Sequence, residues 1–419
     1  MAVAQGFGKT LSKNLVFGYD IGDTRNSFRG APGTNIAVGP NRSYSGISVS
    51  NYDDGRLFAS NGYTETVYIP TLGFRSVESV EVYNIYTGYG EGGNYNCCPN
   101  LFNYHGGQEF AGGTTYTYQI IYKCESGYTN PNYMYHYEYG PSGYITEYGV
   151  HTESQRTHLG DGWYHAWATF TTDSRTTSGY KGLWYYNYNT RDKVSIAAIS
   201  IVPGTSVRPP SQFIDENSTR TSTQAILDLA GLSSIDANCS FGSVGELIFD
   251  GTDDRLIVRP NQPISVGNYA MEVVFSASAL PSKRHYLIDP RGDGSENNSP
   301  MYFLFDDNGS QIRVVGGNSN IEVSSGWISI QTNKFYHLVC TRTAATCTLY
   351  LNGTEIGSAN TGTETLTISN PFRIGTYSAA SSGQYFLNGK IAVARIYSRG
   401  MTQSDVNQNY NHYKTRFNL

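Results

Sequence analysis

Charged side chains are scarce in this sequence, and long hydrophobic runs are absent. Asp, Glu, Lys and Arg make up 15% of the 419 residues, the formal net charge is −5, and no cluster of Lys and Arg occurs. Proteins that bind nucleic acid use such clusters to neutralise phosphates, so we exclude nucleic acid as a partner. No apolar run approaches the roughly 18 residues of a membrane span, and residues 1–17 lack the apolar segment of a signal peptide. We therefore expect synthesis in a cytoplasm, without membrane insertion.

Cysteine is also rare, and its pattern argues against a metal centre or a disulfide framework. The six cysteines match no zinc spacing, and Cys97 and Cys98 are adjacent. We expect free thiols, as in a reducing compartment. Whether Cys340 and Cys347 form a disulfide across a hairpin stays open.

Sequence motifs of common enzymes are missing as well. The chain has no Glu-x-Asp-x-x-Glu strand, which would place an acid and a nucleophile on one face for retaining glycoside hydrolysis. It also has no G-x-S-x-G, H-E-x-x-H or phosphate-binding loop. His165 and His337 fit strand positions better than catalytic ones. The sequence predicts a non-enzymatic protein with no catalytic residues, no metal and no cofactor.

Glycine and tyrosine are abundant, with 46 and 35 residues. Short runs rich in Tyr, Val, Ile and Thr alternate with Gly and Asn turns, a pattern typical of β-sandwiches. We predict an all-β fold with two jelly-roll or β-sandwich domains and one short C-terminal helix. A capping box at Thr402 and Asp405 begins this helix and places Val406, Tyr410 and Tyr413 on one face.

Composition divides the chain into four segments. Residues 1–34 form an N-terminal arm with a strand at 14–22, and residues 35–203 form a tyrosine-rich β-sandwich. Residues 204–224, rich in Pro, Ser and Thr, are the linker, and residues 225–419 form the second sandwich. The strand at 14–22 is either the first strand of the first sandwich or a member of the C-terminal sheet, with residues 35–203 inserted after it.

Two stretches of the C-terminal half contain turn motifs. Residues 246–258 alternate around an Asp-Gly pair, and we expect a β-hairpin there, because Gly251 can adopt the positive φ that tight turns require. Asn352-Gly353 and residues 307–309 are further hairpin turns.

An ordered series of motifs in residues 225–419 resembles the laminin-G-like, concanavalin-A-like jelly-roll family. The series is ELIFDGTDDRLIV, NYAMEVVFSAS, KFYHLVCTRTAATCTLYLNGTEIG, FRIGTY and FLNGKIAVARIYSRGMTQSDVNQNY. Residues 35–203 are more weakly similar to carbohydrate-binding-module-like jelly rolls through TYTYQIIYK, DGWYHAWATFTT and VSIAAISIVPG. The overall order of these parts resembles structural proteins of tailed bacteriophages. The fold alone does not decide function, because lectins, glycosidases and adhesion modules share it.

Alternating tyrosines are the main candidates for a binding site. A strand places all of them on one face, where their rings can stack on sugars and their hydroxyls can form hydrogen bonds; a core face or a subunit interface is the alternative. Trp163 joins them because it follows the Asp161-Gly162 turn. The predicted glycan-binding residues are Tyr133, Tyr135, Tyr137, Tyr139 and Trp163.

Clustered carboxylates are the only candidates for a metal site. Asp250, Asp253 and Asp254 are close in sequence, as are Asp289 and Asp293. Calcium needs several converging oxygens, and turn geometry explains these aspartates without an ion, so we predict no metal.

The resemblance to phage structural proteins, together with the missing enzyme motifs, implies a non-enzymatic phage virion protein: a fibre, spike or capsid decoration subunit on the particle surface. The resemblance implies contacts with other virion proteins and a homo-oligomer, with adhesion to host surface polysaccharide as its work. A stand-alone glycan-binding module or glycosidase-derived lectin is the first alternative. A purely structural, capsid-stabilising protein is the second.

Overall fold

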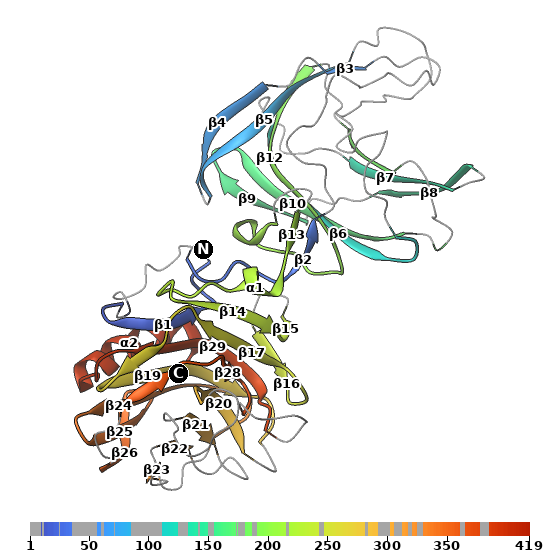
Figure 1. The fold of residues 1–419 in the computed structure, drawn as a ribbon. Helices are drawn as coiled ribbons and strands as arrows, with labels where there is room; N and C mark the ends of the chain where they lie inside the picture. The colour runs from blue at the N-terminus through green and yellow to red at the C-terminus, as the bar shows by residue number, and fades with distance from the viewer. Residues whose placement is uncertain are drawn as a thin grey trace. The chain divides into compact units, whose positions relative to one another are not determined.

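The computed structural model divides the chain into two compact units. Unit 1 comprises Met1–Ala31 and Thr221–Leu419, and unit 2 comprises Pro32–Arg220. Both consist mainly of antiparallel β-sheets (Figure 1), and the predicted all-β fold is confirmed. The structure describes residues 10–35, 57–84, 111–124, 133–149, 155–174, 181–186, 191–214, 218–242, 247–280, 284–291, 302–305, 312–316, 321–324, 330–360, 365–377 and 385–419, except 11, 25, 60–62, 71, 141–142 and 173. Among these residues, no helix is long and apolar enough to cross a membrane.

The described residues of unit 2 form three sheets. The largest has the strand order β3-β5-β12-β6-β10-β9, with β4 also paired to β5; the others are β11-β7-β8 and β2-β13. Its elements are β2 (Gly33–Asn35), β3 (Leu57–Ala59), β4 (Tyr63–Ile69), β5 (Gly73–Asn84), β6 (Thr115–Cys124), β7 (Tyr133–Gly140), β8 (Gly143–Gly149), β9 (Arg156–Gly160), β10 (Trp163–Thr171), β11 (Lys181–Tyr186), β12 (Arg191–Pro203), the 3-10 helix η3 (Pro210–Gln212) and β13 (Ser218–Arg220).

Unit 1 is a sandwich of two large sheets. The β29 sheet has the order β15-β16-β29-β19-β24-β25-β26, with β1 also paired to β29, and the β28 sheet has the order β14-β17-β28-β20-β21-β22-β23. The elements are β1 (Leu15–Asp20), α1 (Ser222–Ala225), β14 (Ser233–Asn238), β15 (Ser240–Phe241), β16 (Leu247–Asp250), β17 (Arg255–Pro260), β18 (Ile264–Val266), β19 (Tyr269–Ala277), β20 (His285–Asp289), β21 (Tyr302–Phe305), β22 (Ile312–Gly316), β23 (Ile321–Ser324), β24 (Phe335–Thr343), β25 (Thr346–Leu351), β26 (Thr354–Asn360), β27 (Leu366–Ile368), β28 (Phe372–Ile374), β29 (Asn388–Tyr397) and α2 (Gln403–Phe417). Strands β18 and β27 form a separate pair.

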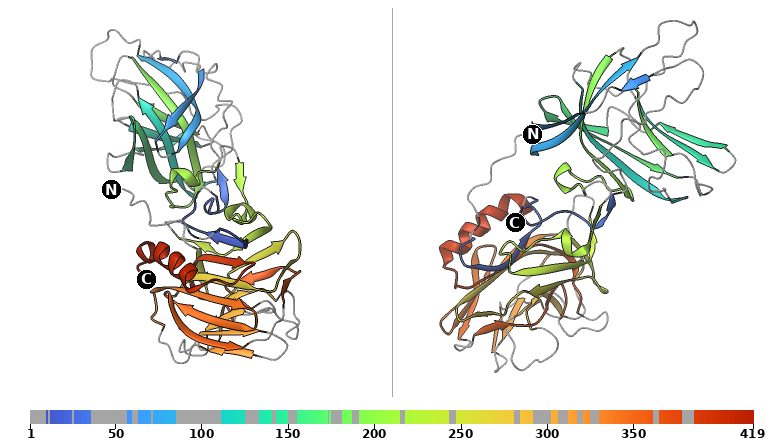
Figure 2. Two further views of the ribbon diagram at one scale, coloured as in Figure 1. Left: turned by 90° about the vertical axis from the view of Figure 1, so that its left-hand side faces the viewer. Right: turned by 45° about the horizontal axis from the view of Figure 1, so that its top comes forward.

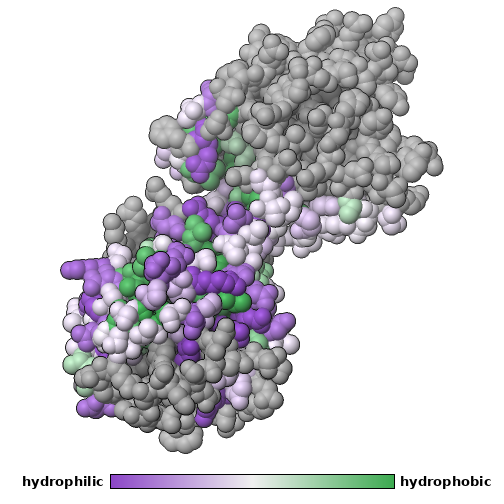
Figure 3. Space-filling view, viewed as in Figure 1, coloured by the Kyte–Doolittle hydropathy of each residue, from purple (hydrophilic) through white to green (hydrophobic). Residues whose placement is uncertain are grey.

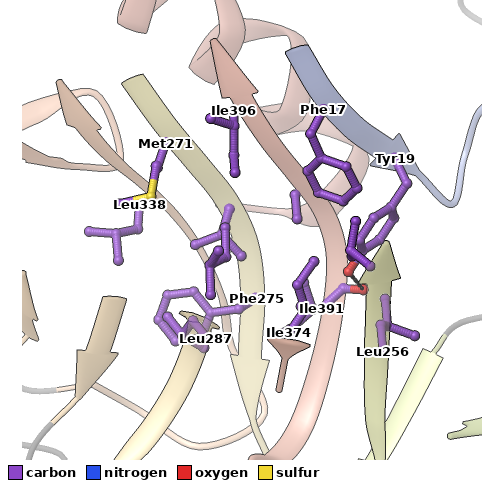
Figure 4. Close-up of a cluster of buried hydrophobic side chains, with 14 of the residues drawn as sticks. Phe17, Tyr19, Leu256, Met271, Phe275, Leu287, Leu338, Ile374, Ile391 and Ile396 are labelled. Atoms are coloured by element: carbon purple, nitrogen blue, oxygen red, sulfur yellow. Dashed lines mark hydrogen bonds between the residues drawn. The ribbon is translucent and has the colours of Figure 1, made fainter. Parts of the chain in front are cut away.

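The N-terminal strand β1 lies in the β29 sheet, which is one of the two arrangements that the sequence allows. It runs antiparallel to β29, with Tyr19 opposite Ala394. The side chains of Phe17 and Tyr19 are fully buried in the unit 1 core (Figure 4). The Phe17 ring meets the Phe372 ring of β28 edge-on, with the ring centroids 5.2 Å apart. Strand β1 therefore helps to join the two sheets of the sandwich.

The predicted hairpin at residues 246–258 is wrong. Strand β16 pairs with β29, whereas β17 pairs with β14 and β28, so the Asp-Gly turn carries the chain from one sheet to the other. The alternation itself is real, because Leu247, Phe249 and Leu256 are all buried in the core between the sheets. By contrast, β25 and β26 do form the hairpin predicted at Asn352-Gly353, where both residues have positive φ. The turn expected at residues 307–309 lies outside the described residues.

Helix α2 covers the outer face of the β29 sheet (Figure 2). Its predicted capping box is confirmed: the Thr402 hydroxyl accepts the Asp405 amide, and the Asp405 carboxylate accepts the Thr402 amide. Val406 and Tyr413 are fully buried beneath the helix. Strand β19 is consequently buried on both faces, which explains its nearly continuous run of apolar residues.

The helix is also anchored by a buried polar network around Glu272. This carboxylate accepts hydrogen bonds from the Tyr397 hydroxyl at 2.9 Å and the Asn409 amide at 2.9 and 3.1 Å. It lies 2.7 Å from the His337 ring nitrogen Nε2. All four residues are fully buried, so this acid and histidine hold α2 on the sheet and are closed to a substrate.

The capping carboxylate gives a first prediction. The hydrogen bond from Arg399, at 2.7 Å, holds the pKa of Asp405 at about 2, below its ordinary value of 3.8. The stabilisation is therefore complete above pH 3.8 and is lost as the pH falls toward 2. We expect Asp405→Asn to lower the free energy of unfolding by about 1 kcal/mol at neutral pH, measured by urea denaturation. A wild-type stability near pH 2 equal to that at pH 7 would contradict this account.

Candidate functional site

The alternating tyrosines of the predicted site lie on β7. This strand is the centre of a three-stranded sheet, between β11 and β8. Backbone pairing sets Tyr135 opposite Trp184 and Tyr137 opposite Gly182. Their side chains, with those of Tyr133 and Tyr139, lie outside the described part of the structure, so their contact with glycans stays a prediction.

Trp163 fills the core of unit 2. Only 2% of the residue is exposed, and it packs with Ile69, Val77 and Ile121. The preceding Asp161 and Gly162 have the positive φ expected of a turn, but this turn directs the ring inward. We therefore assign Trp163 to the core and no longer to the glycan-binding site.

The acidic turn at residues 250–254 brings three carboxylates together. Oxygens of Asp250, Asp253 and Asp254 lie within 4.8 Å of one another. The Asp250 carboxylate accepts the amides of Thr252 at 2.7 Å and Asp253 at 3.3 Å, and the Asp254 carboxylate accepts the Asp250 amide at 3.0 Å. Desolvation acts to raise the pKa of the Asp250 carboxyl. The hydrogen bonds from the backbone amides outweigh this effect, so the pKa is lowered. These bonds cap the turn and explain the cluster without an ion.

A group of three tyrosines on the β28 sheet was not evident from the sequence; we call it the tyrosine cluster. Tyr286 lies on β20, while Tyr377 and Tyr385 lie between β28 and β29. The ring centroids are 5.1 Å apart for Tyr286 and Tyr377, 5.9 Å for Tyr286 and Tyr385, and 5.7 Å for Tyr377 and Tyr385. Tyr286 is buried, and the other two are partly exposed. Only Tyr377 and Tyr385 can therefore present ring surface to a ligand.

An ion pair fixes the base of the tyrosine cluster. Arg291 Nε lies 2.7 Å from Asp289 Oδ1, and Arg291 Nη2 lies 2.9 Å from Asp289 Oδ2. The guanidinium carbon lies 4.7 Å from the Tyr377 ring centre and 5.5 Å from that of Tyr286, within the range of a cation–π contact. Burial raises the pKa of the Tyr286 phenol, and the Arg291 charge acts in the opposite direction. The rings thus rest on a guanidinium that two hydrogen bonds hold in one plane.

Hydrophilic and apolar side chains intermingle on the face of unit 1 shown in Figure 3. The exposed large apolar residues of the described part are Tyr68, Leu227, Leu232 and Leu280. The tyrosine cluster combines ring faces with hydrogen-bonding groups, which suits an amphipathic ligand such as a sugar.

Residues 250–407 match the family model described as the concanavalin A-like lectin/glucanases superfamily. The C-terminal region is therefore a jelly roll of this type, as the motif series predicts. The matched stretch contains the acidic turn and all three residues of the tyrosine cluster. No curated protein matches the chain in sequence.

Several solved structures share distant similarity with the chain. The botulinum neurotoxin serotype D binding domain is 15% identical with a TM-score of 0.36; the match covers 46% of this chain and 49% of that domain, so the chain spans about half of its length. Trypanosoma rangeli sialidase is 14% identical with a TM-score of 0.35, over 54% of this chain and 41% of the sialidase. The Ruminococcus gnavus IT-sialidase CBM40, bound to α2,3-sialyllactose, is 9% identical with a TM-score of 0.30, over 35% of this chain and 83% of that module. At these values, neither ligand nor activity transfers to this chain.

Proposed function

We propose that this chain is a non-enzymatic glycan-binding protein and that the tyrosine cluster is one of its contact surfaces. The observation that carries the proposal is the pair of partly exposed rings, Tyr377 and Tyr385. The buried Tyr286 ring packs against both of them, and the Arg291 guanidinium packs against the Tyr377 ring. Tyrosine rings stack on the apolar C–H face of a pyranose, while the hydroxyl bonds to sugar hydroxyls. Rings held in place before binding lose little conformational entropy when a sugar arrives.

The setting of this activity is the second part of the proposal. The chain would be displayed on a bacteriophage particle as a fibre, spike or capsid decoration subunit. It would form a homo-oligomer, and this oligomer would contact other virion proteins. The order of its parts supports this: an opening strand, a tyrosine-rich sandwich and a concanavalin A-like jelly roll. Immunogold labelling of particles would distinguish a tail fibre from a capsid decoration subunit, and an absence of label would favour a stand-alone binding module.

Loss of glycan binding in a tyrosine variant is the direct test. We expect the wild-type protein to bind a subset of a broad glycan array, and the double variant Tyr377→Ala/Tyr385→Ala to bind at least tenfold more weakly. Tenfold corresponds to about 1.4 kcal/mol, a typical cost for truncating an interface tyrosine. Tyr377→Phe should retain most of the affinity, because the ring face remains.

Two controls make this result specific. Tyr68→Ala changes a tyrosine that is 54% exposed and lies on β4 of unit 2, and it should leave binding unchanged. A variant with Tyr133, Tyr135, Tyr137 and Tyr139 all changed to Ala tests the strand predicted from the sequence. If the double variant binds like the wild type while the β7 variant does not, the site lies on β7. If the wild type binds no glycan, a structural role in the capsid replaces the proposal.

A further inference from the structure

Two buried cysteines face each other on the hairpin formed by β24 and β25. Cys340 lies opposite Leu349, and Cys347 is two residues before Leu349 on the same strand, so the cysteines are diagonal neighbours on one face of the pair. This face looks into the sandwich, because both cysteines are fully buried in the unit 1 core. Their Sγ atoms are 2.9 Å apart. The fold therefore brings together two sulfur atoms from different strands.

The distance between the sulfur atoms distinguishes this pair from ordinary buried cysteines. A buried cysteine commonly acts as a small apolar side chain, and Cys340 has such surroundings, with Met271 and Leu349 opposite it on the neighbouring strands. A disulfide bond is about 2.05 Å long, so the pair at 2.9 Å is in its thiol form. The sulfurs are nevertheless in direct contact, and each needs to move by only about half an ångström to form the bond.

Reaction of these cysteines with an external reagent requires the hairpin to open. Both residues are 0% exposed, so a reagent cannot reach either sulfur in the closed sandwich. Burial also raises the pKa of the Cys340 thiol well above its ordinary value, and the adjacent Cys347 raises it further, which suppresses the reactive thiolate. The described strand order of the β29 sheet ends with β24, β25 and β26. Local unfolding of β25 and β26 from this end would expose both sulfurs.

We propose that Cys340 and Cys347 form a disulfide when the chain folds, or opens locally, in the presence of a low-molecular-weight disulfide such as oxidised glutathione. One cysteine thiolate attacks the glutathione disulfide and releases one glutathione, which leaves a mixed disulfide on the protein. The second cysteine thiolate attacks the protein sulfur of this mixed disulfide and releases the other glutathione. The protein loses two electrons and two protons, and one oxidised glutathione becomes two reduced molecules.

The bond joins two neighbouring strands of the β29 sheet covalently. It closes a loop of eight residues, from Cys340 to Cys347, and so restricts the unfolded chain. Strand β24 also carries His337, whose Nε2 atom lies 2.7 Å from Glu272 in the network that holds α2. The disulfide therefore stabilises the part of the sheet on which α2 rests. It does so once the chain has left a reducing compartment, where thiols stay reduced.

Peptide mass spectrometry of the full wild-type chain tests the bond directly. The protein is refolded with excess oxidised glutathione or with a reductant, its remaining thiols are alkylated in denaturant, and it is digested with trypsin. Cleavage after Lys334, Arg342 and Arg373 separates the two cysteines, so the disulfide joins peptides 335–342 and 343–373. We expect this joined pair to predominate in the oxidised sample and both peptides to be alkylated in the reduced one. Alkylation of both peptides after oxidative refolding would overturn the proposal.

Cysteine variants connect the bond to stability. We expect oxidation to raise the melting temperature of unit 1, measured by calorimetry on the full chain, by about 5 °C, as is typical of a disulfide that closes a short loop. Cys347→Ala should abolish this shift, whereas Cys239→Ala, at a partly buried cysteine of unit 1, is the matched control and should keep it. An equal shift in Cys347→Ala, or an unchanged melting temperature in the cross-linked wild type, would overturn the stabilising role.

Discussion

Replacing Glu272 with alanine is expected to lower the free energy of unfolding of unit 1 by about 3–5 kcal/mol, the range typical of a buried ion pair that loses one partner. Glu272 is fully buried and bonds to side chains on three other elements: His337 of β24, Tyr397 of β29 and Asn409 of α2. Arg395 is 4% exposed and contributes a favourable charge to this carboxylate. Without Glu272, the Arg395 guanidinium would stay buried without this carboxylate, and the donor groups of Tyr397 and Asn409 would lose their acceptor.

The measurement is urea denaturation followed by circular dichroism, together with proteolysis of the C-terminal helix. Glu355→Ala provides the control, because Glu355 is an exposed carboxylate on β26 and its loss should change stability by less than about 0.5 kcal/mol. Faster cleavage within α2 in Glu272→Ala would place the damage at the helix. Equal stability of the two variants would show that the Glu272 network contributes nothing to the fold.

The same network makes the stability of unit 1 depend on pH. Burial alone would raise the pKa of Glu272, but its bonds to His337 and Tyr397 and the charge of Arg395 outweigh that effect, so the pKa lies below the ordinary value of 4.5. A carboxyl with a lowered pKa stabilises the fold fully above pH 4.5 and loses this contribution as the pH falls through its folded-state pKa. The stability difference between the wild type and Glu272→Ala should therefore shrink as the pH falls below 4.5.

Local signals predicted the turns and caps of this protein but not the partners of its strands. The Asn352-Gly353 hairpin and the Thr402–Asp405 capping box depend on a few adjacent residues, and the sequence contains them completely. The Asp-Gly turn at residues 250–251 is equally clear, yet it joins β16 and β17 in opposite sheets. Alternation around a turn is the same in a hairpin and in a connection between sheets, so only long-range pairing distinguishes the two.

The candidate site shows the same limit more strongly. Tyr286 and Tyr377 are 91 positions apart in the sequence, and the sandwich brings their rings to 5.1 Å. The sequence indicated Asp289 only as one of two acids close in sequence, Asp289 and Asp293. It did not predict the ion pair between Asp289 and Arg291 that the structure shows. For Trp163 the local signal was correct and the inference from it was wrong. The Asp161-Gly162 turn is present, but the Trp163 side chain is buried in the core.

Excision of unit 2 should leave a folded unit 1. The chain leaves and re-enters unit 1 at neighbouring points, where the Arg29 amide donates to the Ala225 carbonyl at 2.9 Å and Phe28 bridges to Ile226. Within unit 2, Gly33 and Arg220 are likewise paired. A variant in which a short Gly-Ser linker joins Ala31 to Thr221 should therefore unfold cooperatively and keep the saccharide affinity of the tyrosine cluster.

The matched comparison is the fragment Thr221–Leu419 without residues 1–31. It lacks β1 and with it two fully buried aromatic rings, Phe17 and Tyr19. Truncating one such ring costs about 3–5 kcal/mol, and a domain is stable by only about 5–15 kcal/mol in total, so this fragment should not fold. The linked variant and the fragment are compared by circular dichroism and calorimetry. A cooperative thermal transition in the fragment would show that β1 is dispensable, and its absence in the linked variant would show that unit 1 needs unit 2 to fold.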